Sequence, residues 1–326
     1  MQVLPQSKWR PRAERHAAAV EQLAADRLAR RVEGRKHPVD DFLWEYYSLR
    51  PAQLSRWHPG PGMALEGASE RATWSFYRVT DGTDRGPGGE GLPGGTAYLD
   101  LDAFRDRRGQ TLDFVRELLT ATLSRPGRFG CFGLHEWAMV YRADEGQVRH
   151  QGWPLRLGAE GTDAVVESHQ IGCSHFDAYR FFTPQAAPRN TLSPTREGQV
   201  ATEQPGCLHA GMDLYKWCYK LSPLVPSELT LRAFVLARDI RELDMRAAPY
   251  DLRELGYEPV RIETPQGKAE YVEAQRAFTV RSNALRRELL DVLDLGIDLA
   301  APDAPDAPDA QDAQDAQDAN VGQTSW

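Results

Sequence analysis

The stretch from Thr195 to Leu299 constrains the fold most, because nearly all of it has the composition of long helices. It contains the runs HAGMDLYKWCYKL, SELTLRAFVLARDIRELDM and AEYVEAQRAFTVRSNALRRELLDVLDL. These runs are rich in Ala, Leu, Arg and Glu, which are strong helix formers. Further helices are expected over residues 7–32, 38–57 and 111–123. Long amphipathic helices must bury their apolar faces against one another, so we predict a helix-rich α+β fold.

A small sheet is expected in the first third of the chain. Residues 72–80, ATWSFYRVT, are mostly β-branched or aromatic and alternate in polarity, which is typical of a strand. The segment TAYLDLD, at 96–102, is the candidate partner strand. The chain has 326 residues and 41% apolar content, which is enough for a sizeable core. We predict a single compact domain over residues 1–299.

The end of the chain, residues 300–326, differs in composition from the rest. It repeats Ala-Pro-Asp and then Ala-Gln-Asp, with six aspartates and no Lys or Arg. Such a segment buries too little apolar surface to offset its loss of conformational entropy, so we predict a disordered acidic tail. The net charge of −8 becomes −2 without these six aspartates. The acidic balance therefore argues only weakly against a polyanionic partner.

The sequence contains no signal for export or membrane insertion. No run of about 18 apolar residues occurs, and the first residues lack an apolar signal core. We therefore expect no membrane span and a cytoplasmic location. The four cysteines show no CxxC spacing, and in that compartment they would remain thiols. Phosphate-loop, Rossmann, nucleophile-elbow and kinase motifs are also missing from the sequence.

The segment ESHQIGCSHFD, residues 167–177, concentrates side chains that titrate or bind metals. If it is extended, every second side chain from Glu167 to Asp177 lies on one face. His175 and Asp177 have the H-x-D spacing of sites in which two histidines and a carboxylate bind iron, and His209 is the candidate third ligand. This arrangement would make the chain an Fe- or Zn-dependent enzyme acting on a small molecule. Alternatively, these side chains hydrogen-bond one another, as in a non-catalytic binding module.

A second group of polar residues lies on the predicted helix that starts near His209. His209, Asp213, Lys216 and Lys220 follow three-and-four spacing and share one face. Asp213 is a candidate to orient His209, and the two lysines are candidates to bind an anion. The alternative is ordinary surface and core contact. The charge-rich run at 237–246 predicts a solvated or internally paired helix face.

The chain resembles a bacterial family, of actinobacterial type, that carries the label 3-methyladenine DNA glycosylase. The segments that carry the likeness are HPVDDFLWEYYSLRPAQLSRWHPG, GCFGLHEWAMVYR, CSHFDAYRFFTP, PGCLHAGMDLYKWCYKL and ARDIRELDMRAAPYDLRELGYEPVRIET. Together they reach from about residue 35 to residue 276. The resemblance implies a DNA repair hydrolase of base excision, which releases alkylated purines from DNA by hydrolysis of the N-glycosidic bond and uses no cofactor.

That reaction needs a base held between aromatic faces, a carboxylate beside the sugar and cations for the phosphates. The candidate catalytic residues are Asp177, His175, Asp213 and His209. The candidates for base stacking are Trp137, Tyr141 and Trp217, and those for phosphate binding are Lys216 and Lys220. The helix-hairpin-helix signature of one glycosylase superfamily is incomplete, because GLPGGTAYLDLD lacks one residue of the hairpin.

Overall fold

The computed structural model describes residues 1–47, 49–83, 85, 91–143 and 152–300. The fold is helix-rich α+β with a small mixed sheet, which confirms the predicted class. The tail predicted at 300–326 lies outside the described residues, apart from Ala300, which ends the last helix. Within the described ranges, no helix combines the length and apolar character that a membrane span requires.

The elements follow one another along the chain as helices with a few short strands. The α-helices are α1 (Gln6–Val32), α2 (Phe42–Tyr46), α3 (Pro51–Leu54), α4 (Leu101–Leu123), α5 (Leu134–Ala138), α6 (Gly158–Glu167), α7 (Phe176–Tyr179), α8 (Gln199–Thr202), α9 (Leu208–Lys220), α10 (Ser227–Arg246) and α11 (Pro265–Ala300). The strands are β1 (Gln2–Leu4), β2 (Met63–Leu65), β3 (Tyr77–Val79) and β4 (Ala97–Leu99).

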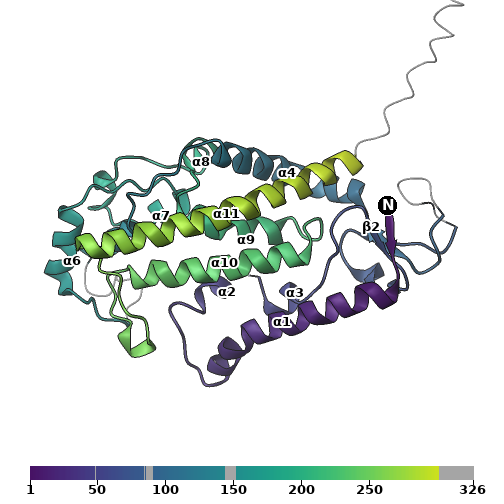
Figure 1. Cartoon of the computed structure of the whole chain (residues 1–326), viewed down its shortest axis with the longest axis horizontal. Helices are drawn as coiled ribbons and strands as arrows, with labels where there is room; N and C mark the ends of the chain where they lie inside the picture. Colours follow the sequence, from purple (N-terminus) through teal and green to yellow (C-terminus); the bar gives the residue numbers. More distant parts are fainter. Residues whose placement is uncertain (48, 84, 86–90, 144–151, 301–326) are drawn as a thin grey trace, which may run out of the picture.

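The centre of the molecule is a layer of long helices, which Figure 1 shows running side by side. α9 packs along α10, α11 contacts both, and α4 packs on α11. Gly211 permits the close approach of α9. A Cβ at this position would lie 2.6 Å from Oγ of Ser282 on α11 and 3.0 Å from Cδ1 of Ile240 on α10. Because glycine has no side chain, α9, which carries His209 and Asp213, can pack closely against α10 and α11.

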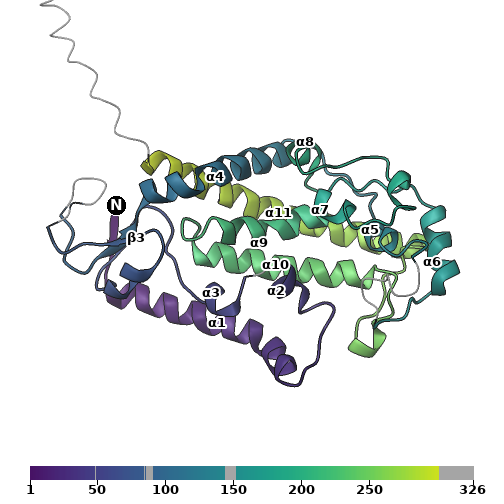
Figure 2. The same ribbon diagram turned by 180° about the vertical axis from the view of Figure 1, so that it is seen from behind.

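The sheet has the strand order β1-β2-β4-β3, with β1 parallel to β2 and the other pairs antiparallel. The pairing of β3 with β4 confirms the strands predicted within 72–80 and 96–102. Figures 1 and 2 place the sheet at the opposite end of the molecule from α5 and α6. The site described below lies away from the sheet, among helices.

Two local predictions are wrong. The helix predicted over 38–57 is divided into α2 and α3, because Arg50 precedes Pro51 and adopts the extended conformation that such a position favours. The extended conformation that would place every second side chain of 167–177 on one face does not form. α6 continues to Glu167, and the residues that follow contribute one isolated bridge, from Ile171 to Asn190. Side chains in this segment therefore do not alternate between two faces.

Candidate metal centre and adjoining cavity

Three potential metal ligands from different segments meet inside the molecule. His135 lies on α5, His209 lies in the first turn of α9, and Asp244 lies in the last turn of α10. One ligand atom of each lies within 4.8 Å of those of the other two. The rings of His135 and His209 meet edge to face, with centroids 4.4 Å apart.

The contact between His135 and Asp244 has the geometry of two ligands of one ion. Nε2 of His135 lies 3.1 Å from Oδ1 of Asp244. Both atoms are buried; they form an ion pair with each other, and neither has a further hydrogen-bond partner among the described residues. Two atoms that bind one ion at about 2.1 Å lie about 3.0 Å apart at right angles and about 3.4 Å apart at the tetrahedral angle. The observed separation lies within this range.

The charges around the cluster suit metal binding at Asp244 and His209, whereas His135 must release a proton when an ion binds. Burial alone would raise the pKa of Asp244, but His135, His209 and Arg241 stabilise its carboxylate and bring the pKa below its usual value. Burial, reinforced by His135, brings the pKa of His209 well below its usual value, so this imidazole is neutral. Burial would also lower the pKa of His135, but the carboxylate of Asp244 raises it well above the usual range. Neutral imidazole and ionised carboxylate are the forms that bind metals.

A buried ion pair between Arg241 and Glu136 contacts Asp244. Nη1 of Arg241 donates to Oδ2 of Asp244 at 3.1 Å and to Oε1 of Glu136 at 2.8 Å. Both carboxylates and the guanidinium are almost wholly buried. On the other side, Sγ of Cys131 lies 3.9 Å from Nδ1 of His135. Partners of this kind fix the orientation of metal ligands.

A cavity of about 240 Å³ adjoins His135 and His209. Its wall also includes the thiols of Cys131, Cys173 and Cys207. Burial raises the pKa of both Cys173 and Cys207, so these two remain protonated. Because the thiolate is the form that binds metals, the imidazoles and the carboxylate are the better donors at this place.

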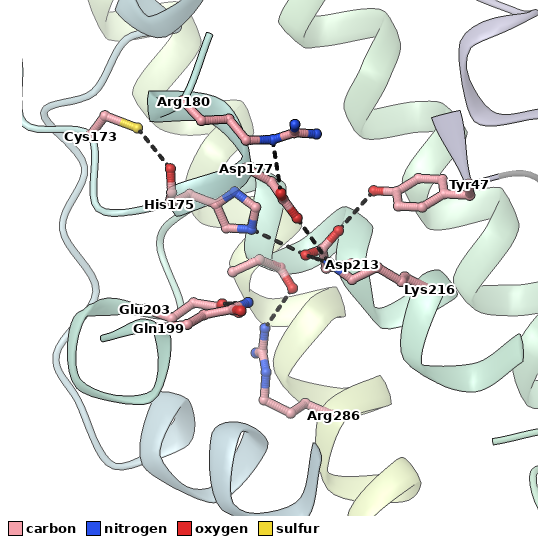
Figure 3. Close-up of polar contacts among 11 residues, drawn as sticks. Tyr47, Cys173, His175, Asp177, Arg180, Gln199, Glu203, Asp213, Lys216 and Arg286 are labelled. Atoms are coloured by element: carbon pink, nitrogen blue, oxygen red, sulfur yellow. Dashed lines mark hydrogen bonds and ion pairs between the residues drawn. The ribbon is translucent and has the colours of Figure 1, made fainter. Parts of the chain in front are cut away.

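Figure 3 shows a polar network centred on Asp213. It adjoins His209, because the ring of His175 stacks on that of His209 with centroids 5.3 Å apart. Nε2 of His175 lies 3.1 Å from Oδ2 of Asp213, and the hydroxyl of Tyr47 donates to Oδ1 at 3.1 Å. The ammonium of Lys216 donates to Asp213 and lies 3.5 Å from Asp177. Burial would raise the pKa of Asp213, but Lys216 and then His175 lower it below its usual value. Asp213 is therefore ionised in the interior.

The structure brings the four candidate catalytic residues together, in two adjoining groups. His175, Asp213 and Asp177 belong to the polar network, and the ring of His175 stacks on that of His209 at 5.3 Å. The iron site predicted from His175, Asp177 and His209 is not assembled, because His175 faces Asp213 and Asp177 faces Lys216. His209 meets His135 and Asp244 instead.

The candidates for base stacking and phosphate binding do not line the cavity. Trp137, Tyr141 and Trp217 are buried in the core, and the indole nitrogen of Trp137 donates to the carbonyl of Ala247 at 2.8 Å. Lys216 is paired with carboxylates. The remaining candidate, Lys220, is exposed at the end of α9. Their proposed roles on DNA stay predictions.

Two residues of the metal cluster, His135 and Asp244, are not among the predicted site residues. Asp244 lies in the charge-rich run that was predicted to be solvated or paired. However, Ala233, Ala237, Ile240 and Asp244 follow three-and-four spacing on α10, and all four are buried. The position of Asp244 on the apolar face of this helix is the feature of the sequence that indicates a buried carboxylate.

Comparison with known proteins finds no matching family model, no matching curated protein and no matching solved structure.

Proposed function

We propose that the chain is a metal-dependent enzyme acting on a small polar molecule, with one divalent ion bound by His135, His209 and Asp244. The observation that supports this most is the convergence of two imidazoles and an ionised carboxylate beside a cavity. Nitrogen and carboxylate donors of this kind suit iron and zinc. Catalytic sites of these metals use three such protein ligands and leave the remaining coordination positions open for water or substrate.

The cavity would let water or a substrate occupy the open coordination positions of the ion. His135 and His209 both belong to its wall, so water or a substrate atom in the cavity can reach an ion between them. The ion would polarise a substrate oxygen or lower the pKa of bound water. The volume of about 240 Å³ is below the range of roughly 300–1,000 Å³ found for drug-sized ligands. We therefore expect a substrate of few heavy atoms.

Equilibrium dialysis with Zn²⁺, and with Fe²⁺ under anaerobic conditions, tests the proposal. We expect the full chain to bind about one ion, as a single site with three protein ligands should. The variants His135→Ala, His209→Ala and Asp244→Asn should bind at least tenfold more weakly. His169→Ala is a matched control, because Nδ1 of His169 bonds to the carbonyl of Val165 at 2.7 Å and lies outside the cluster. Equal binding by all four variants would disprove the assignment.

Release of alkylated purines from DNA is a second candidate function, and the ionised, buried Asp213 beside His175 favours it. A carboxylate of this kind would stabilise positive charge that develops on a sugar. The two functions differ in their need for metal. If chelator-treated protein releases bases from methylated DNA and Asp213→Asn abolishes the release, the glycosylase function is supported and the metal-dependent one is contradicted. Protein that neither binds metal nor releases bases would fit a non-catalytic binding module.

A further inference from the structure

We propose, on the basis of the metal-dependent function above, that the substrate is a small anion that also carries a hydrogen-bond donor. Its anionic group would pair with Arg128 at the cavity wall, and its hydroxyl or amino group would donate to Oε1 of Gln275. Three independent features of the cavity support this: its charge, the anchored backbone of Arg128 and an unsatisfied acceptor.

The charge of the cavity favours an anion. Arg128 belongs to its wall, whereas no Asp or Glu of the described chain does. A divalent ion bound by two neutral imidazoles and one carboxylate keeps a net charge of about +1. Arg241 adds no net charge, because it is paired with Glu136. An uncompensated positive charge in a partly buried site is costly, and a bound anion would compensate it.

The backbone of Arg128 is held in place before any ligand arrives. Its N–H donates to Oε1 of Gln204 at 2.8 Å, and the same oxygen accepts the N–H of Gly206 at 2.8 Å. A Cβ on Gly206 would lie 2.5 Å from the carbonyl oxygen of Arg128, so only glycine lets the two loops approach this closely. The side chain of Arg128 is exposed and pairs with no carboxylate of the described chain. An unpaired guanidinium on an anchored backbone is suited to binding a carboxylate or phosphate.

Gln275, on α11, supplies an acceptor without a partner. Its side chain is 1% exposed and belongs to the cavity wall. The amide Nε2 donates to the carbonyl of Gly206 at 2.6 Å, and because a carbonyl only accepts, this fixes which end of the amide carries the nitrogen. Oε1 then has no hydrogen-bond partner within the described part of the chain. Buried acceptors are normally satisfied, and a donor on the ligand would complete this one after a small shift of the Gln275 side chain, because Oε1 has almost no accessible surface without a ligand.

Three probes of the same carbon number separate charge from hydrogen bonding. Malate has carboxylates and a hydroxyl, succinate lacks the hydroxyl, and butane-1,4-diol lacks the charge. By isothermal titration calorimetry on the zinc-loaded full chain, we expect malate to bind roughly tenfold more tightly than succinate, as one added hydrogen bond predicts. The diol should not bind detectably at millimolar concentration.

The variant Arg128→Gln should weaken malate binding at least tenfold and leave zinc affinity unchanged. Arg105→Gln, which makes the same charge change on an exposed residue of α4, is the control and should bind malate normally. Equal malate affinity in the two variants would overturn the role of Arg128. Equal affinity of the wild-type chain for malate and succinate would overturn the role of Gln275, and binding of the diol would overturn the charge requirement.

Failure of the metal-dependent function can be told apart from failure of this inference. If the chain binds no zinc, the same titrations are made on chelator-treated protein, in which Arg128 and Gln275 are unchanged. Malate binding that depends on Arg128 would then still support the substrate class. If neither form of the protein binds malate at millimolar concentration, the substrate class is wrong.

Discussion

The charge of Asp244 should contribute strongly to folding stability, and the variant Asp244→Asn measures that contribution in metal-free protein. Asp244 is fully buried and faces His135 and Arg241, each at 3.1 Å. Removal of one partner from a buried ion pair typically costs about 3–5 kcal/mol, because the other charge is left uncompensated. Here Glu136 still pairs with Arg241 and His135 can lose its proton, so we expect the lower value, about 3 kcal/mol.

Urea unfolding in the presence of a chelator provides the assay. With a slope of about 3 kcal/mol per molar urea, which suits a chain of this size, the midpoint should fall by about 1 M. Asp239→Asn is the matched control on the same helix. Its carboxylate pairs with Arg281 at 2.7 Å but is partly exposed, so the cost should be below about 1 kcal/mol. If Asp244→Asn lowers the midpoint no more than Asp239→Asn does, the buried ionised carboxylate is disproved.

Three further perturbations test the surroundings of the site. Lys216→Met removes the ammonium that keeps Asp213 ionised, and should lower the free energy of unfolding in urea by about 3 kcal/mol. In a double-mutant cycle, adding Asp213→Asn should recover part of this loss. Strictly additive effects of the two substitutions would contradict the pairing. Gly211→Ala should cost about 2 kcal/mol by thermal denaturation, because its Cβ would meet Ser282 and Ile240, and Ser282→Ala should restore part of the stability; an unchanged melting temperature would disprove the tight packing. Burial, and then Arg71, lowers the pKa of the half-buried His58 to about 3. Below about pH 6.5 the unfolded chain therefore binds a proton that the folded chain excludes. The free energy of unfolding decreases as the pH is lowered through this range. Between pH 8 and pH 5 the wild-type chain should lose at most about 2 kcal/mol more than His58→Gln, and an equal loss would contradict the shift.

Local composition predicted the long helices well. α1, α9, α10 and α11 appear where Ala-, Leu- and Arg-rich runs predicted them, because propensity and an apolar stripe agree over many turns. The extended conformation considered for 167–177 is absent, because it rested on an alternation among polar side chains, whereas a strand is indicated by alternating apolar and polar ones. Val165 and Val166 are neighbours and both are buried, which a half-exposed strand does not allow but a helix does.

The metal cluster was predictable only in part. Spacing drew attention to His209, which the structure places in the cluster, but its partners come from α5 and α10. Sequence spacing identifies neighbours within one helix, whereas this cluster depends on how three segments pack. Asp244 lies in a run of charged residues, and composition alone does not distinguish it from exposed members of that run such as Arg238. The packing of α9 against α10, which Gly211 permits, brings it to His209.

X-ray absorption at the zinc edge of the loaded full chain tests the metal centre most directly. Three thiols line the same cavity, so the measurement must distinguish nitrogen and oxygen ligands from sulfur. We predict a first shell of nitrogen and oxygen at about 2.0–2.1 Å, with the outer-shell scattering of two imidazoles, that is lost in His209→Ala. Sulfur at about 2.3 Å, or zinc without imidazole scattering, would contradict coordination by His135, His209 and Asp244.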